Sequence, residues 1–145
     1  MQIHINIDDS ATDTEISIKC SKLTPEIETL LATLRMLDSQ MTVVKGGETF
    51  FVDVSDIYYI ESVDRKTFVY TKSDVYESKL RLYEIEERLC AGGFFRAGKS
   101  CIIQIRYIRS LKTDIDRRIR VTLENGEMLM VSRQYSDELK HRLGL

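Results

Sequence analysis

The chain has 145 residues, of which 43% are hydrophobic and 30% are charged, and its formal net charge is −2. This length suits one domain of ordinary size, with a core that needs neither disulfides nor metal. No apolar run approaches the roughly 18 to 20 residues of a membrane span, and the polar start, MQIHINIDDS, lacks the apolar segment of a signal peptide. These features argue against a membrane-spanning or secreted protein, and we expect a cytoplasmic one.

Residues that could carry catalysis or hold a metal are scattered along the chain. The three cysteines, Cys20, Cys90 and Cys101, are odd in number and widely spaced, which favours reduced thiols over a disulfide framework or a zinc site. The two histidines, His4 and His141, lie at opposite ends and in no recognisable nucleophile motif. We therefore expect no enzyme, no cofactor and no metal.

The first 40 residues predict a small ββα module. Isoleucines alternate with polar residues over residues 3–7, and an apolar residue recurs at every second position over 16–20, so each stretch predicts a half-buried strand. Thr24 and Pro25 then provide an N-cap and a first helical residue. The apolar face of this helix consists of Leu23, Ile27, Leu30, Leu31, Leu34 and Leu37. Because so small a module cannot hold a core alone, it must pack on the next domain, on a second copy, or on both.

Residues 41–145 predict a second domain that is mainly β with short helices. Two hairpin signals, Gly46-Gly47 and Asn125-Gly126, lie between apolar stretches. Helical spacing occurs at 80–90 and again at 134–143. The predicted strands cover residues 41–45, 48–54, 57–61, 67–71, 75–79, 101–105, 108–113, 118–123 and 127–131.

Positive charge is concentrated in residues 96–120. Eight of these residues are Lys or Arg and only Asp114 and Asp116 are acidic, a local excess of six positive charges. Such an excess can build a positive surface on a nearly neutral protein. Charged residues that protect solvated strands and sheet edges explain the same composition equally well.

A phosphate-binding motif occurs in the same region. Gly93, Gly98, Lys99 and Ser100 satisfy the pattern G-x-x-x-x-G-K-[ST] of nucleotide hydrolases. That motif works when a strand enters the glycine loop and a helix leaves it. Here a predicted helix precedes the motif and a predicted strand follows it. The context therefore favours a cationic turn, with a nucleotide-binding protein as a rival interpretation.

Three predicted turns carry cations beside small or hydroxyl side chains. Arg65, Lys66 and Thr67 form the first, Gly98, Lys99 and Ser100 the second, and Ser132, Arg133 and Gln134 the third. Small residues allow a phosphate backbone to approach closely, and an arginine can bond guanine bidentately in a major groove. The turns could therefore reach DNA, if they share one edge of the domain.

A series of motifs runs in order through residues 42–145. They are IYYIE (57–61), RKTFVY (65–70), YESKLRL (76–82), Leu89 with FFRAGKS (94–100), residues 108–110, Asn125-Gly126 and residues 131–133. In this order they resemble the LytTR DNA-binding domain of bacterial transcription regulators. Sequences of that family often have His or Lys at the position of Thr67, a difference that affects the expected base preference. They often have Asn at the position of Gln104, a difference that affects only a turn.

This resemblance implies an elongated β fold that presents loops to successive major grooves on one face of double-stranded DNA. It places base and phosphate contacts on Thr67, Lys99 and Arg133. With their neighbours, the residues that we expect to contact DNA are Arg65, Lys66, Thr67, Arg96, Lys99, Ser100, Arg133 and Gln134. About 40 residues precede the matching part, too few for the phosphoacceptor domain that often comes before it. The chain is therefore similar to stand-alone LytTR regulators, which are commonly encoded beside a small membrane protein, a candidate partner here.

We therefore expect a sequence-specific DNA-binding transcription regulator without catalysis. The leucine-faced helix from Thr24 to Leu37 either pairs two copies into a homodimer or packs within the chain. The alternative functions are a protein-interaction adaptor for a membrane partner and a nucleotide-binding protein.

Overall fold

The structure is a computed structural model that describes residues 1–12, 14–37, 39–90 and 92–145. Its helices are α1 (Pro25–Leu37), α2 (Leu82–Leu89) and α3 (Arg133–Arg142). Its strands are β1 (Gln40–Lys45), β2 (Glu48–Asp53), β3 (Tyr59–Val63), β4 (Lys66–Tyr70), β5 (Val75–Ser78), β6 (Phe94–Gly98), β7 (Cys101–Gln104), β8 (Ile108–Thr113), β9 (Ile119–Leu123) and β10 (Met128–Val131). The expected mainly β fold is confirmed. No helix of the described residues combines the length and hydropathy that a bilayer crossing requires.

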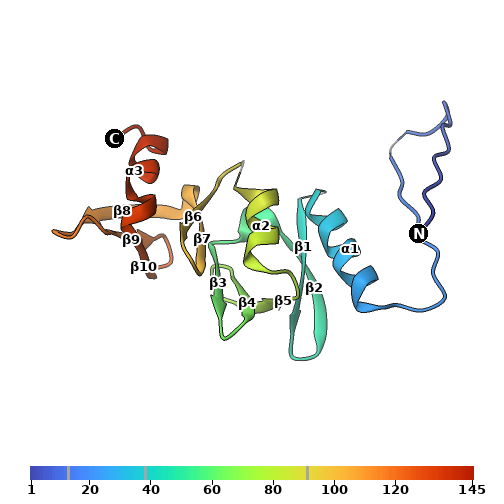
Figure 1. The fold of residues 1–145 in the computed structure, drawn as a ribbon, viewed down its shortest axis with the longest axis horizontal. Coiled ribbons are helices and arrows are strands. Elements are labelled where there is room, and N and C mark those ends of the chain that lie inside the picture. The colour runs from blue at the N-terminus through green and yellow to red at the C-terminus, as the bar shows by residue number, and fades with distance from the viewer. Residues whose placement is uncertain (13, 38, 91) are drawn as a thin grey trace.

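The strands form two antiparallel sheets. The larger has seven strands in the order β2-β1-β5-β4-β3-β7-β6, and the smaller has three in the order β10-β9-β8. Figure 1 shows an elongated molecule, with α1 beyond one end of the large sheet and the small sheet with α3 at the other.

Three strands of the large sheet are buried on both faces. Successive residues of a strand point to opposite faces, so Ile60 and Ile102 join the core beneath α2, whereas Tyr59 and Ile103 join the core shared with the small sheet. This arrangement explains the continuous apolar runs in β3, β6 and β7. Close packing of side chains on both faces holds these strands in position. The turns at the ends of these strands are therefore held in position as well.

Strand β6 was not expected from the sequence. Residues 94–98 looked like part of a glycine-rich turn, but Phe94 and Phe95 are both buried, one in each core. β6 pairs with β7, and the register shifts between Arg96 and Gly98 at the end of β6. The G-x-x-x-x-G-K-S motif is therefore a β-hairpin in which a strand follows the lysine. It lacks the helix N-terminus on which nucleotide binding depends.

The two predicted N-terminal strands are absent from the described residues. Residues 1–12 and 14–23 contain neither helix nor strand, and Ile3, Ile5 and Ile7 are 82%, 84% and 87% exposed. The alternation of apolar and polar residues was not sufficient to predict these strands. A strand also needs a neighbouring strand that pairs with its backbone groups and a surface that buries its apolar side chains. Figure 1 shows the segment extending away from the domain beyond α1.

Helix α1 forms as expected and packs on β1. The hydroxyl of Thr24 accepts a hydrogen bond from the Ile27 amide at 3.4 Å, which agrees with the predicted N-cap. Ala32 joins the core, whereas the apolar side chains of Ile27, Leu30, Leu31 and Leu34 are only half-buried. The side chain of Leu37, expected on the same face, lies outside the described part of the chain.

Candidate nucleic-acid interface

Two backbone hydrogen bonds join the three cationic turns into one row. The Ser62 amide, at the end of β3, donates to the Ser100 carbonyl at 2.8 Å. The Ser132 amide, just before α3, donates to the Ala97 carbonyl at 2.9 Å. Since Glu61 pairs with Cys101 in antiparallel register, the β3–β4 and β6–β7 turns lie at the same end of the sheet. The turns at 64–65, 98–100 and 132–134 thus form a continuous surface, which we call the cationic rim.

The first turn of the rim has an unusual backbone conformation. Asp64 and Arg65 have φ angles of 51° and 67°, in the left-handed region that favours glycine. Consecutive left-handed residues suit a two-residue hairpin turn, because its twist matches that of the flanking strands. The turn leaves Arg65 and Lys66 exposed. An arginine held where glycine would be easier is consistent with a functional role for its side chain.

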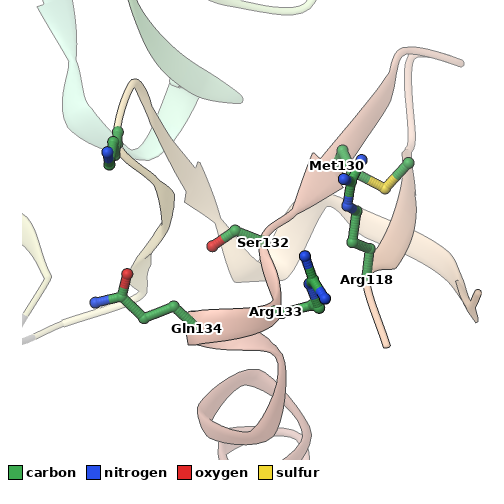
Figure 2. A pocket seen from close by; sticks show the side chains of 6 residues that line it. Arg118, Met130, Ser132, Arg133 and Gln134 are labelled. Carbon is green, nitrogen blue, oxygen red and sulfur yellow. The ribbon is translucent and has the colours of Figure 1, made fainter. Parts of the chain in front are cut away.

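The second and third turns border one shallow cavity of about 400 Å³. Three of its lining residues are among the expected DNA contacts, namely Lys99, Arg133 and Gln134, and Ser132 belongs to the third predicted turn. Figure 2 shows Ser132, Arg133 and Gln134 where β10 leads into α3, with Arg118 and Met130 beside them. Lys99 and Ser100 are exposed at the tip of the β6–β7 hairpin.

Arg118 and Met130 complete the cavity and were not predicted as site residues. Arg118 belongs to the cationic run of residues 96–120, so its charge was visible in the sequence although its position was not. Met130 lies on β10 between Leu129 and the buried Val131 and is 42% exposed. Strand alternation could have placed Met130 on the outer face, but only the fold shows that this face adjoins Arg133.

Arg96 plays a structural part in the rim, contrary to its place among the expected DNA contacts. Its side chain is 16% exposed and pairs with the Glu86 carboxylate on α2. Its Nε donates to the Gly98 carbonyl and its Nη2 to the Lys99 carbonyl, both at 2.6 Å. With all three nitrogens occupied inside the protein, Arg96 fixes the shape of the hairpin tip that displays Lys99.

Thr67, another of the expected DNA contacts, is buried in the structure. Its residue is 5% exposed and lies within β4, paired with Ser62 on one side and Ser78 on the other. A side chain buried at the centre of a sheet cannot reach a ligand without opening the strands. The exposed cations just before it, Arg65 and Lys66, are the groups that this turn offers.

Gln104, expected in a turn, is the last residue of β7, and its side chain bonds the backbone of a neighbouring segment. Its side chain is buried, and its Nε2 donates to the Ile57 carbonyl at 2.5 Å and to the Val54 and Ser55 carbonyls at 3.3 Å. The Tyr107 hydroxyl donates to the same Ser55 carbonyl at 2.7 Å. These bonds satisfy carbonyls that enter β3 and so support the strand that ends at the rim.

The cations of the region divide into paired and unpaired groups. Arg118 pairs with Asp116 at 3.2 Å and Arg120 with Asp114 at 3.5 Å. Within the described residues, the rim cations Arg65, Lys66, Lys99 and Arg133 form no ion pair with a carboxylate. Unpaired cations on one surface keep their attraction for an anion, and that attraction extends over about 8 to 10 Å at moderate salt.

The beginning of α3 strengthens this attraction. Ser132 is the N-cap, and its side chain makes no capping hydrogen bond. The ten-residue helix therefore begins at residues that line the cavity, and its N-terminus is the positive end of the helix dipole. Together with Arg133 and Lys99, they suit a phosphate group better than a neutral ligand.

The thiols beside the rim are poorly suited to chemistry. Burial raises the pKa of the Cys101 thiol to about 12 and that of the Cys90 thiol to about 11. At neutral pH both are therefore protonated and weakly nucleophilic. Among the described residues, no group of three or more His, Cys, Asp or Glu is arranged to hold a metal ion.

The fold and the rim are those of a β domain that can bind a polyanion through turns. The sequence profile of the LytTr DNA-binding domain matches residues 47–144 of this chain. This match covers most of the chain, and the chain belongs to the LytTR family. A solved LytTr DNA-binding domain from Bacillus cereus has a TM-score of 0.70 and 27% sequence identity, covering 74% of this chain and 98% of that one.

Full-length relatives also match. An uncharacterized HTH-type transcriptional regulator of Staphylococcus aureus strain NCTC 8325 / PS 47 is 27% identical over 100% of this chain and 99% of its own length. A protein of the same description from strain MRSA252 is 26% identical with the same coverage. In the described part of this chain, strands separate α1, α2 and α3 from one another, so no two consecutive helices form a helix-turn-helix.

Proposed function

We propose that this chain is a sequence-specific DNA-binding transcription regulator that contacts major grooves through the turns of the cationic rim. The observation that carries the proposal is the row of three turns joined by the Ser62–Ser100 and Ser132–Ala97 hydrogen bonds. These bonds make the turns that carry residues 65, 99 and 133 neighbours, although the residues are far apart in the chain. Membership of the LytTR family and the regulator relatives support the same function.

Each side chain of the rim has a chemical role in this proposal. Arg133, at the start of α3, reads a base, and guanine is the base that offers two acceptors to a guanidinium. Lys99 holds a phosphate or a base edge, and Gln134 and Ser100 add hydrogen bonds to the backbone. Arg65 and Lys66 hold phosphates beside the first turn. Arg96 makes no DNA contact and shapes the tip that carries Lys99.

The proposal also includes the oligomeric state of the protein, its location in the cell and a partner protein. We propose a homodimer that occupies two half-sites, because two copies read twice the sequence of one. We place the protein in the cytoplasm with the chromosome. A small membrane protein is the partner we propose for signal input. No catalytic step is required for any of these roles.

DNA selection tests the proposal. The full chain would be incubated with random duplexes, and the recovered sequence measured by fluorescence anisotropy at several salt concentrations. We expect one enriched motif, tighter binding to it than to a scrambled duplex, and a Kd that rises steeply with salt. Recovery of no motif, with equal binding to all duplexes, would contradict sequence-specific binding.

Arg133→Ala tests the assignment of the site. It should weaken binding to the selected duplex by about 1 to 3 kcal/mol and relax the preference at one base pair. Lys72→Ala is the matched control, because Lys72 is an exposed cation in the β4–β5 turn at the other end of β4. Equal losses in both variants would indicate a general charge effect. A thermal shift with ATP addresses the nucleotide-binding alternative, for which stabilisation by the nucleotide is expected.

A further inference from the structure

The N-terminal end of the molecule carries apolar surface that its own chain leaves uncovered. Ile3, Ile5 and Ile7 are almost fully exposed, and Ile16 is 65% exposed. Soluble chains rarely leave so many large aliphatic side chains in water within one short segment. We call residues 1–22 the N-terminal arm. Its alternation of apolar and polar residues is that of a strand with one buried face, although the arm has no strand partner in the structure.

The domain offers a matching surface next to α1. A cavity of about 200 Å³ lies between α1 and the outer face of β1 and β2, lined in part by Leu23, Leu31, Ala32, Val44 and Phe51. Phe51 is 50% exposed and Leu23 is 60% exposed. We call this cavity the α1 groove. Five of its ten lining residues are apolar, so it can accept aliphatic side chains.

The backbone beside the α1 groove is also open to pairing. β2 is the outermost strand of the seven-stranded sheet, and β1 is its one strand partner among the described residues. Its other edge therefore has backbone groups that an added strand could satisfy.

Charge favours the arm as the occupant. Residues 1–22 contain four acidic residues and two lysines, a net charge of −2. The groove is lined by Arg35 and Lys79 against a single acid, Glu28, which pairs with Lys79 at 2.5 Å. Arg35 lies 4.0 Å above the Phe51 ring with no carboxylate partner among the described residues. An acidic arm therefore meets a groove of net positive charge.

The observed course of the arm favours a second copy as the occupant of the α1 groove. In the structure the arm leads away from the domain (Figure 1), and its isoleucines contact no surface of their own chain that would bury them. An extended arm of 22 residues can reach about 70 Å. Each copy has one arm and one groove, so reciprocal exchange between two copies leaves neither unfilled and closes the assembly at a dimer.

We propose that two copies of this chain form a dimer by arm exchange, in which the N-terminal arm of each adds a strand along β2 of the other and buries its isoleucines in the α1 groove. The proposal deepens the homodimer of the proposed function and does not depend on which DNA sequence is bound. α1 then contributes a wall of the groove, and its half-buried Leu31 is covered by the partner's arm.

Sedimentation equilibrium of the full chain without DNA tests this dimer. The wild-type chain should sediment at about twice 16.8 kDa. Ile5→Asn with Ile7→Asn should weaken dimerisation at least about tenfold, because apolar side chains would leave the groove. His4→Ser with Asn6→Ser changes the alternate, polar positions of the same arm and should leave dimerisation unchanged. A monomeric wild-type chain, or equal behaviour of the two double variants, would overturn the proposal.

Cross-linking distinguishes exchange from other contacts. Two chains lacking Cys20 (Cys20→Ser) would be mixed, one carrying Ile5→Cys and the other, with a different tag, carrying Thr49→Cys in the groove. Mild oxidation should join the two tags in one covalent species. A dimer without this cross-link would mean that the arm does not enter the partner's groove and would overturn arm exchange. Binding of the isoleucine variant to a single half-site should remain at the wild-type value, which separates failure of the arm from failure of DNA binding.

Discussion

Replacing Arg65 by glycine should stabilise the fold and weaken DNA binding at the same time. Arg65 has a φ of 67°, exposes its side chain and forms no ion pair within the described residues. A left-handed conformation costs a residue with a Cβ atom about 1 to 2 kcal/mol. Glycine avoids this cost but loses about 0.5 to 1 kcal/mol in conformational entropy on folding. The net gain for Arg65→Gly is therefore about 0.5 to 1 kcal/mol.

Two assays measure the two effects of Arg65→Gly. A gain of this size should raise the melting temperature of a domain of this length by about 2 to 4 °C. The same variant removes one phosphate contact, so the slope of log Kd against log salt should fall by about 1. Arg65→Lys keeps both the charge and the strained backbone and should match the wild type in both assays. A lower melting temperature would refute the strain, and an unchanged salt slope would refute the phosphate contact.

Further predictions concern neighbouring residues. Lys99→Ala should weaken binding to all duplexes and reduce the slope of log Kd against log salt by about 1. Thr67→Ser changes a buried position and should leave the affinity unchanged in the same anisotropy titration. A loss for Thr67→Ser equal to that for Lys99→Ala would return Thr67 to the site. Arg96→Met should lower the unfolding free energy by about 2 kcal/mol, because hydrogen bonds to charged groups contribute about 1.5 to 3 and this side chain is partly exposed. Urea unfolding measures that loss, and Glu86→Gln, which keeps an acceptor, should cost less. Iodoacetamide at pH 8 should modify the exposed Cys20 well before Cys90 and Cys101, since burial raises the pKa of the Cys90 and Cys101 thiols. Mass spectrometry measures the order in which the three thiols are alkylated. Early modification of Cys101 would contradict its burial.

Local signals in the sequence were sufficient for much of the fold. Gly46 and Gly47 have φ angles of 58° and 79° in the β1–β2 turn, and Gly126 has a φ of 89° in the β9–β10 turn, as the hairpin signals require. Helix α2 begins and ends within two residues of its predicted bounds. Such turns and caps depend on residues close together in the chain, so a single sequence can indicate them.

The missing elements depend on contacts that a sequence does not show. β6 was hidden because Phe94 and Phe95 are both buried, in two different cores, and the alternation of a half-buried strand is therefore absent. The alternation at residues 3–7 predicted a strand that does not form. Among the described residues, no strand pairs with this segment and no surface buries its isoleucines. Thr67 illustrates a third limit: its neighbours in the turn are exposed, and only its position between β3 and β5 buries it.

The candidate site was predictable in composition but not in arrangement. Lys99, Arg133 and Gln134 carry the expected chemistry and line one cavity. Arg96 carries the same charge and uses it for Glu86 and two backbone carbonyls. Residue type alone could not separate these roles, because a displayed cation and a structural cation differ only in what surrounds them.

The most direct test of the account is the DNA affinity of the combined variant Arg65→Ala, Lys99→Ala and Arg133→Ala, measured on the selected duplex over a range of salt. If the three turns act as one surface, the salt slope should fall by about 2 to 3 and the preference over a scrambled duplex should largely disappear, while circular dichroism remains that of the wild type. Wild-type affinity and salt dependence in this correctly folded variant would show that DNA is bound elsewhere or not by these turns.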